Sequence, residues 1–589
     1  MTNRTYYLIS IVIASWLSTS GMPACGVTPS VTNMPPQRYA WSTDHIQVGV
    51  RWQPFVGQAE VNAFDATRAV IAEDSSYVQF WVSWRAAEPQ AANTNYASNM
   101  SIYLADIEEA VDVCVAEGLQ VEFVFWHCPA WASESGQAGG VKSKPNHYRD
   151  FVTRIARHFK GRVGAYQLQH EANLGGFIRD GDIEFLLNEI FVKGARAIRT
   201  VYAEKPTREV IVSTSGCSPC EACNTIEGLG VKGGKAVSLF YERQAGHAEL
   251  MSLVDAININ MSDHFNGYGS MDGSYVASCW DNYDLAKEKL DAAGHFGKQV
   301  MGAESWIVWD NAGNATDVNG DGVKDERDAY SKAVTIIGKC LERGLCSVNL
   351  PWSDNSSGWA MGLTKRRDVT GKVAQSQPEW VIPANDNGPA VVTRKMTLHG
   401  AGAQTRVLEG SGHQYTVENF INPSDPNHLH YYIWRWYAQL AGGADEVIRH
   451  AMAGEVDNDI IVNGPGFTGS ERYRLCSYNR SRQEFTVLIY ASGAGGTAWT
   501  DVKIPARIQD GMVFNNAHSR FDFRGEGFSD GESYVAIVET KRIDGETGAD
   551  KEAKVSTSKP MKVANGTLSV RVGQMLPFTK VTFRQAKAQ

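Results

Sequence analysis

Eight short apolar segments constrain the fold of this chain more than any other feature of its sequence. They span residues 45–52, 77–84, 119–126, 164–170, 209–215, 254–262, 298–304 and 346–352. Most are rich in Val, Ile or aromatic residues, and such continuous apolar character is typical of parallel strands buried on both faces. Amphipathic segments of helical period separate them, so the sequence predicts a (β/α)8 TIM barrel rather than an open doubly wound sheet.

The barrel is expected to occupy residues 41–403, with a last helix over 390–401. Beyond residue 403 the helical period fades, and short alternating apolar runs follow one another between turns rich in Gly, Asn and Asp. This pattern predicts a C-terminal all-β, sandwich-like domain over residues 404–589. No glycine-rich phosphate loop follows any of the strands, so nucleotide binding has no support.

The first 25 residues have the composition of a signal peptide: Arg4 precedes a short apolar run, and small residues lead up to Cys25. Cys25 allows two interpretations, acylation as in a bacterial lipoprotein or ordinary secretion. Residues 26–40, rich in Pro, Thr and Ser, are expected to form a linker. No segment reaches the length of a membrane span, so a secreted, periplasmic or cell-surface protein is predicted.

The charge balance narrows the possible partners. The 589 residues carry a net charge of −9, and 43% of them are hydrophobic, as in a soluble globular protein. A nucleic-acid partner would require clustered basic residues, and the only basic cluster in the sequence is a short run at 365–367. The sequence therefore argues against nucleic-acid binding.

Two glutamates stand at the ends of predicted strands: Glu171 follows the fourth strand and Glu304 ends the seventh. In a (β/α)8 barrel the carboxyl ends of the strands carry the active site. Two carboxylates that face each other across a groove are what glycosidic bond cleavage requires. We therefore expect these two residues to be catalytic.

Tryptophans gather at the same end of the predicted barrel. Trp52, Trp84, Trp126, Trp306 and Trp352 all fall at or just beyond the ends of predicted strands. Sugars present apolar C–H faces that pack on aromatic rings, so these five side chains predict a carbohydrate groove.

The segment that contains Glu171, Gly-Ala-Tyr-Gln-Leu-Gln-His-Glu-Ala-Asn-Leu, resembles the fourth-strand signature of clan A glycoside hydrolases. Its ending, with Asn173 followed by Leu, is closest to family 39. Residues 80–89, which end in Glu-Pro, and residues 124–131, which end in Pro-Ala-Trp, are similar to the second and third strands of that clan. The resemblance covers residues 45–405.

The resemblance implies that Glu171 is the general acid/base and Glu304 the nucleophile of a retaining mechanism. His170 stands where the clan usually has an Asn that binds the sugar 2-hydroxyl, and this His-Glu pair is similar to mannan-active enzymes of family 26. Either His264 or Tyr268 is implied to hold the nucleophile. Together with Asn173, these residues complete the predicted substrate site.

Residues 317–328 form a second motif, in which oxygen ligands occupy positions 1, 3, 5, 9 and 12 and a glycine occupies position 6. The ligands are Asp317, Asn319, Asp321, Asp325 and Asp328. This spacing resembles the calcium loops of EF-hands and dockerins. We expect a structural Ca²⁺ here and no cofactor for the chemistry; the alternative is a solvated acidic loop.

The ten cysteines include a cluster at Cys217, Cys220 and Cys223. Three thiolates at this spacing can bind zinc or an iron–sulfur cluster. No second cysteine pair follows at ligand spacing, and export favours oxidation, so a disulfide-stapled loop is the preferred interpretation. Cys340 and Cys346 are also close enough in sequence to form a disulfide.

These features predict an exported retaining glycoside hydrolase that acts on a polysaccharide or oligosaccharide by double displacement with two glutamates. The alternative is a non-catalytic carbohydrate-binding surface protein on the same barrel. The sugar, its linkage and the choice between endo and exo action depend on loop lengths, and the sequence leaves them open.

Overall fold

The computed structural model describes two parts of the chain. In the N-terminal part these are residues 47–52, 77–91, 96, 100–116, 118–138, 143–172, 183–204, 210–216, 233–262, 270–271, 274–275, 279–306, 345 and 347–351. In the C-terminal part they are residues 393–399, 403–409, 413–417, 446–451, 461–463, 472–479, 484–491, 500–505, 533–543, 550–562, 567–572 and 578–586.

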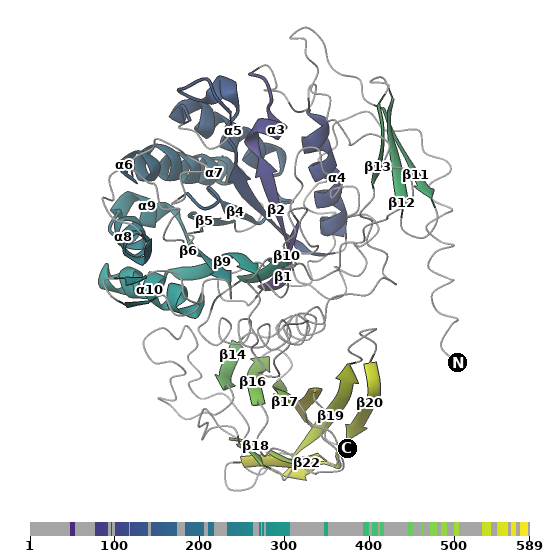
Figure 1. Cartoon of the computed structure of the whole chain (residues 1–589). Helices are drawn as coiled ribbons and strands as arrows, with labels where there is room; N and C mark the ends of the chain where they lie inside the picture. Colours follow the sequence, from purple (N-terminus) through teal and green to yellow (C-terminus); the bar gives the residue numbers. More distant parts are fainter. Residues whose placement is uncertain are drawn as a thin grey trace.

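One parallel sheet of eight strands forms the centre of the N-terminal part (Figure 1). Its strands are β1 (Gln47–Trp52), β2 (Tyr77–Ser83), β3 (Gln120–Trp126), β4 (Ala165–Gln167), β5 (Ile211–Ser213), β6 (Ala256–Ser262), β9 (Gln299–Trp306) and β10 (Ser347–Pro351). They lie in the order β10-β1-β2-β3-β4-β5-β6-β9. Each coincides with one of the predicted apolar segments, and only β9 runs past the predicted end.

Hydrogen bonds join β9 and β10, the two outermost strands in this order. The Gly302 amide on β9 donates to Ser347 Oγ on β10 at 3.2 Å, and Asn349 Nδ2 donates to the Gly302 carbonyl at 3.0 Å. A parallel sheet whose first and last strands meet in this way is consistent with the predicted (β/α)8 barrel.

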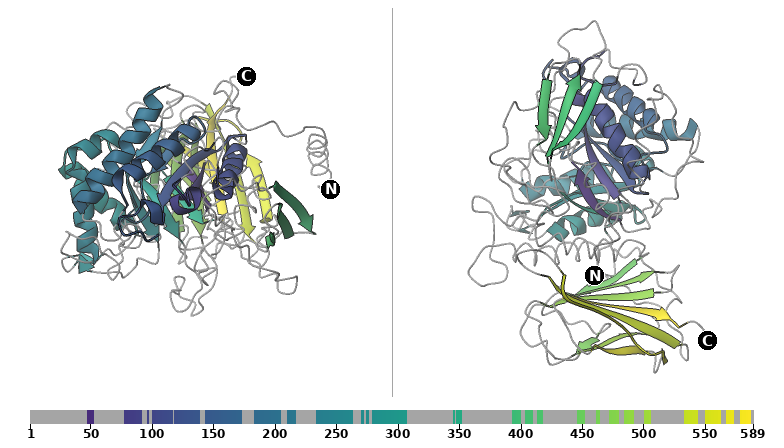
Figure 2. Two further views of the ribbon diagram at one scale, coloured as in Figure 1. Left: turned by 90° about the horizontal axis from the view of Figure 1, so that it is seen from above. Right: turned by 90° about the vertical axis from the view of Figure 1, so that its right-hand side faces the viewer.

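The helices lie outside this sheet (Figures 1 and 2). They are α3 (Trp84–Ala87), α4 (Ile102–Ala116), α5 (Pro145–His158), α6 (Ile183–Phe185), the π-helical turn η3 (Leu186–Val192), α7 (Lys193–Glu204), α8 (Gly233–Ala245), α9 (Ala248–Leu253) and α10 (Cys279–Ala292). Helix α5 shows why they pack there: Tyr148, Phe151 and Ile155 recur at helical spacing and are all buried. Phe151 meets Phe125 of β3 with ring centroids 5.4 Å apart. None of the helices described is both long enough and apolar enough to cross a membrane.

The interior of the barrel consists of layers, because alternate residues of each strand face inward. At the amino end lies an apolar cluster: Tyr77, Ala165, Ile211, Ala256 and Met301. At the carboxyl end lies a second one: Trp81, Val124 and Trp126. A polar layer lies between the two clusters, and each of its residues is two positions along a strand from a cluster member. Its fully buried side chains are Gln79, Glu122, Gln167, Ser213 and Asn258.

The C-terminal strands pair antiparallel, as the predicted all-β composition requires. Three of them form one sheet: β11 (Thr393–His399), β12 (Ala403–Glu409) and β13 (His413–Val417). A seven-stranded sheet contains β14 (Glu446–Ala451), β16 (Arg472–Asn479), β17 (Glu484–Ala491), β23 (Phe578–Gln585), β19 (Ser533–Ile543), β20 (Asp550–Thr557) and β21 (Met561–Lys562). Another three-stranded sheet holds β15 (Ile461–Asn463), β18 (Thr500–Pro505) and β22 (Thr567–Val572). The packing of these sheets as a sandwich stays a prediction.

The helix predicted over residues 390–401 is wrong, because Thr393–His399 forms strand β11. This strand pairs along its whole length with β12, from Thr393 opposite Glu409 to His399 opposite Ala403. Cross-strand pairing therefore outweighs the local helical pattern. The predicted helix over 327–341 lies outside the described residues, and the domain boundary at residue 403 stays a prediction.

Candidate active site

The two predicted catalytic glutamates come together at the carboxyl ends of the strands. Glu171 lies just after β4, and Glu304 lies in the second half of β9. Their side chains are buried, with 8% of Glu171 and 3% of Glu304 exposed. One carboxylate oxygen of each residue and a ring nitrogen of His170 all lie within 4.8 Å of one another.

A third strand contributes an amide that bridges the two carboxylates. Asn260 Nδ2 on β6 donates to Glu171 Oε1 at 2.5 Å and to Glu304 Oε2 at 3.3 Å. The register of β6 and β9 shifts between Ile259 and Asn260, which sets Asn260 opposite Glu304. A β-bulge re-aims side chains in this way, and bulges are frequent beside active sites.

His170 contacts both carboxylates. Its Nε2 lies 3.6 Å from Glu171 Oε2 and 3.4 Å from Glu304 Oε2, and the side chain is 2% exposed. The ring of His170 lies on that of Trp81, with centroids 3.8 Å apart. Trp81 Nε1 in turn donates to Gln79 Oε1 at 3.1 Å, so the imidazole rests on a ring that is itself held by a hydrogen bond.

The backbone at Glu171 is in the left-handed region, with φ 40°. A non-glycine residue there costs about 1–2 kcal/mol, and such strain persists only where neighbouring contacts hold it. Two contacts do so: the Ala172 amide donates to Ser215 Oγ at 2.8 Å, and the His170 amide donates to the Phe125 carbonyl at 3.1 Å. The direction of the Glu171 side chain is therefore fixed by β3 and by the segment after β5 as well as by its own strand.

Two of the predicted groove tryptophans have described side chains. Trp126 is 6% exposed and packs edge-on against Trp81, with centroids 5.3 Å apart, so it contacts the ring on which His170 lies. Trp84 is 2% exposed, stacks on Phe151 of α5, and donates its indole N–H to Glu88 at 2.9 Å. Contrary to its predicted role in a groove, Trp84 takes part in the packing between α3 and α5.

Other predicted site residues fall outside the description. Trp52 and Trp306 end β1 and β9 as expected, but only their backbone is described. Outside the described residues lie Asn173, His264, Tyr268, Trp352, the calcium-loop residues Asp317, Asn319, Asp321, Asp325 and Asp328, and the cysteines Cys25, Cys217, Cys220, Cys223, Cys340 and Cys346. Within the described part, Cys114 and Cys128 are both buried. Burial raises the pKa of Cys128 to about 12, which disfavours a reactive thiolate.

Sequence reasoning missed the role of Trp81 and did not recognise Asn260 as the bridge. Both have a signal that strand alternation could have revealed. Trp81 has the same inward parity as Gln79 on β2, and Asn260 has the same parity as Asn258 on β6. The prediction favoured the residues nearest the strand ends. However, only the alternate residues whose side chains point into the barrel reach the site.

His170, Glu171 and Glu304 offer three ligand atoms that could hold a metal ion. However, the Asn260 amide points its hydrogens at Glu171 Oε1 and Glu304 Oε2, and a cation bound to these oxygens would face those hydrogens. The donor set therefore fits a metal poorly and suits carboxylates that exchange protons and bind hydroxyl groups.

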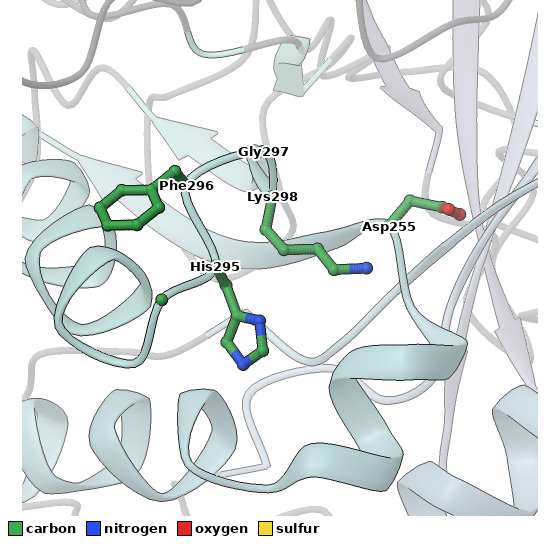
Figure 3. Close-up of a pocket in the computed structure, with 6 residues that line it drawn as sticks. Asp255, His295, Phe296, Gly297 and Lys298 are labelled. Carbon is green, nitrogen blue, oxygen red and sulfur yellow. The ribbon is translucent and has the colours of Figure 1, made fainter.

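A hollow of about 390 Å³ lies at the opposite end of the barrel (Figure 3). Asp255 and Lys298, which line it, immediately precede β6 and β9, so it opens at the amino ends of the strands. Figure 3 shows the Lys298 side chain extending toward Asp255 and the Phe296 ring pointing away. Asp255 Oδ2 accepts from Arg199 at 2.6 Å and from the Val212 amide at 2.8 Å, so this carboxylate stabilises the base of the barrel.

No family model matches the chain, and no curated protein matches its sequence. Among solved structures, it is similar to a GH30 endoxylanase from Clostridium papyrosolvens C71, with 11% identity, a TM-score of 0.44, and 92% of this chain and 97% of that one covered. It is also similar to a glucosidase from Croceicoccus marinus, with 10% identity, a TM-score of 0.46, and 92% and 96% covered. A likeness this distant does not assign the chain to a family.

Proposed function

We propose that this protein is an exported retaining glycoside hydrolase in which Glu171 is the general acid/base and Glu304 the nucleophile. The observation that carries the proposal is the approach of the two carboxylates, with one oxygen of each within 4.8 Å of the other at the carboxyl end of the barrel. Retaining enzymes need their carboxyl groups about 5–5.5 Å apart, whereas inverting enzymes need about 6.5–9.5 Å.

In the first step, Glu304 attacks the anomeric carbon while the protonated Glu171 gives its proton to the departing glycosidic oxygen. The C–O bond to the leaving group breaks, and a glycosyl ester forms on Glu304. In the second step, Glu171, now ionised, takes a proton from water as that water attacks the anomeric carbon. The ester bond breaks, the sugar leaves with its configuration retained, and both glutamates return to their starting states.

Asn260 and His170 preorganise this pair. The Asn260 amide holds both carboxylates before a sugar arrives, so little reorganisation is needed when charge develops. His170, 3.4 Å from Glu304, is placed to donate a hydrogen bond to the nucleophile or to a hydroxyl group of the bound sugar. The sugar-ring carbons would pack against the aromatic side chains at this end of the barrel.

Two variants test the roles of the glutamates separately. Glu304→Ala should lose nearly all turnover, and added azide should then yield a glycosyl azide of inverted configuration. Glu171→Ala should still react with substrates whose leaving group needs no protonation, and azide should yield the retained product. A screen of the wild-type protein on mannans, xylans, β-glucans and uronic-acid polysaccharides identifies the substrate for these assays. An inverted product from the wild type would contradict the proposal.

The alternative, a non-catalytic carbohydrate-binding protein, uses the same residues. Buried carboxylates and an amide can accept and donate hydrogen bonds to sugar hydroxyls without reacting. Glycan binding by the wild type without turnover on any panel member, and unchanged binding by Glu304→Gln, would favour this alternative.

Export, the lipid anchor and the calcium loop are also part of the proposal. A mature chain that begins at Cys25 with an acyl group would establish the anchor, and an unmodified mature N-terminus would exclude it.

Metal analysis should find one calcium per chain in the wild type and none in Asp321→Ala. Absence of calcium at millimolar supply would contradict the loop assignment. Thiol counting after denaturation would separate disulfides from a metal site at the cysteine cluster.

A further inference from the structure

The middle layer of the barrel interior is polar. Barrel interiors are usually filled by bulky branched apolar side chains. Here Gln79, Glu122, Gln167, Ser213 and Asn258 lie between two apolar clusters, and none is exposed. Asn349 on β10, in register with Gly49 of β1, is equally buried. A polar layer in this position needs hydrogen-bond partners.

The orientation of three of these amides is fixed by their nitrogen atoms. Gln167 Nε2 donates to the Gln169 carbonyl at 2.7 Å, Asn258 Nδ2 to the Thr214 carbonyl at 2.9 Å, and Asn349 Nδ2 to the Gly302 carbonyl at 3.0 Å. A backbone carbonyl only accepts hydrogen bonds, so an amide flipped by 180° would place two acceptors together. The amide oxygens must therefore point the other way.

Those oxygens are left without donors. Four oxygens are buried and have no hydrogen-bond partner among the described residues: Gln167 Oε1, Asn258 Oδ1, Asn349 Oδ1 and Glu122 Oε1. Each buried acceptor left unpaired costs about 1–3 kcal/mol. Four such atoms in one layer would destabilise the barrel severely, so the layer needs more hydrogen-bond donors than the described residues supply.

We propose that this polar layer is an internal water-binding site, in which ordered water molecules donate hydrogen bonds to the oxygens of Glu122, Gln167, Asn258 and Asn349. Water suits the layer because the unpaired amide oxygens of Gln167, Asn258 and Asn349 are acceptors, and each water brings two donors. Buried waters typically make about three hydrogen bonds to groups of this kind. The inference does not depend on the proposed glycosidase activity.

Glu122 is held in this layer as a neutral acid. Its described hydrogen-bond partner is Gln79, which donates to Oε2 at 3.0 Å, and the residues in register with Glu122 on the two neighbouring strands are the neutral Gln79 and Ala165. Burial raises the pKa of Glu122 to about 8, and the hydrogen bond from Gln79 offsets this rise only in part. The acid proton adds one donor to the layer.

Through Gln79 and Trp81 the layer supports His170 and thus the floor of the candidate active site.

Water relaxation dispersion measures internal waters of long residence time and tests the site directly. Asn258→Leu should lose at least one such water relative to the wild type. Met301→Leu, in the apolar cluster of the same barrel, should lose none. Equal numbers in all three proteins would overturn the proposal. If Asn258→Leu does not fold, Asn349→Leu provides the same comparison on β10.

Infrared spectroscopy tests the acid form of Glu122 independently of folding yield. The wild type at pH 6 should show a buried carboxylic-acid carbonyl band that Glu122→Gln lacks. The folded pKa of Glu122 lies above the ordinary glutamate value of 4.5, so stability should fall as the pH rises from 4.5 to 8 in the wild type. Glu122→Gln should lack that slope. A midpoint of unfolding that is higher in K⁺ or Na⁺ than in choline, without the acid band, would assign the layer to a cation and overturn the water site.

Discussion

Gly216 and Asn260 fit together only because residue 216 has no side chain. A Cβ atom at Gly216 would lie 2.3 Å from Asn260 Oδ1 and 2.5 Å from the Cβ of Ala303. The glycine in the segment that follows β5 therefore makes room for the amide that bridges Glu171 and Glu304.

We expect Gly216→Ala to displace Asn260 and so disturb both carboxylates. A misplacement of about 1 Å can cost about 100-fold in rate, so kcat/KM should fall by that order while the fold is kept. Gly297→Ala is the matched control, because a Cβ there meets nothing within 4 Å. Activity assays and circular dichroism of both variants provide the measurement, and equal activity of the two would contradict the steric relationship.

Substitutions of Trp81 and Trp84 can distinguish a side chain that positions a site residue from one that only packs in the core. Each is a buried tryptophan whose indole N–H donates to a side-chain oxygen, of Gln79 and Glu88 respectively. Trp81→Phe should lower kcat about 10-fold, because the ring under His170 loses its anchor. Trp84→Phe should instead lower the free energy of unfolding by about 1–3 kcal/mol and leave kcat unchanged. The prediction fails if the two variants show the same kcat.

Glu108 should make stability fall in acid. Burial alone would raise its pKa, but the hydrogen bond to His158 and the charges of His158 and Arg162 lower it to about 2. The folded pKa is below the unfolded one, so the stabilisation is complete above pH 4.5 and is lost as the pH falls toward 2. Urea unfolding between pH 5 and 2 should show about 2 kcal/mol less loss in Glu108→Gln than in the wild type. Glu288→Gln, 65% exposed in the wild type, should leave the slope unchanged.

Arg154, which is partly exposed, forms an ion pair with the buried Glu88 that joins α5 to the end of α3. Both contacts of the guanidinium with the Glu88 carboxylate measure 2.7 Å, and Glu88 is not exposed at all. Arg154→Met should cost about 3–5 kcal/mol of unfolding free energy, because it leaves a buried charge unpaired. Arg149→Met, which breaks an exposed pair with Asp150, should cost less than about 1 kcal/mol.

The double variant Glu88→Gln/Arg154→Met distinguishes an unpaired charge from lost packing. It should recover part of the stability that Arg154→Met alone loses, because no charge is then left in the interior. No recovery in denaturant unfolding would show that the packing of the Arg154 side chain, rather than its charge, carries the effect.

Much of the site could be predicted because strand ends are local features. The apolar runs located all eight strands, and the positions of Glu171 and Glu304 relative to them followed directly. The role of Trp84 could not be predicted in the same way. Its indole donates to Glu88, which also pairs with Arg154 from α5, and that contact joins residues 66 positions apart.

The sequence by itself determined the order of the barrel strands and the two glutamates at their carboxyl ends, because strands buried on both faces require continuous apolar runs. Only the tertiary structure decided that Asn260 bridges those glutamates and that Trp81 supports His170. Both contacts depend on the register between neighbouring strands, on the bulge before Asn260, and on the space left by Gly216. These relations arise between segments far apart in the chain, so no local pattern specifies them.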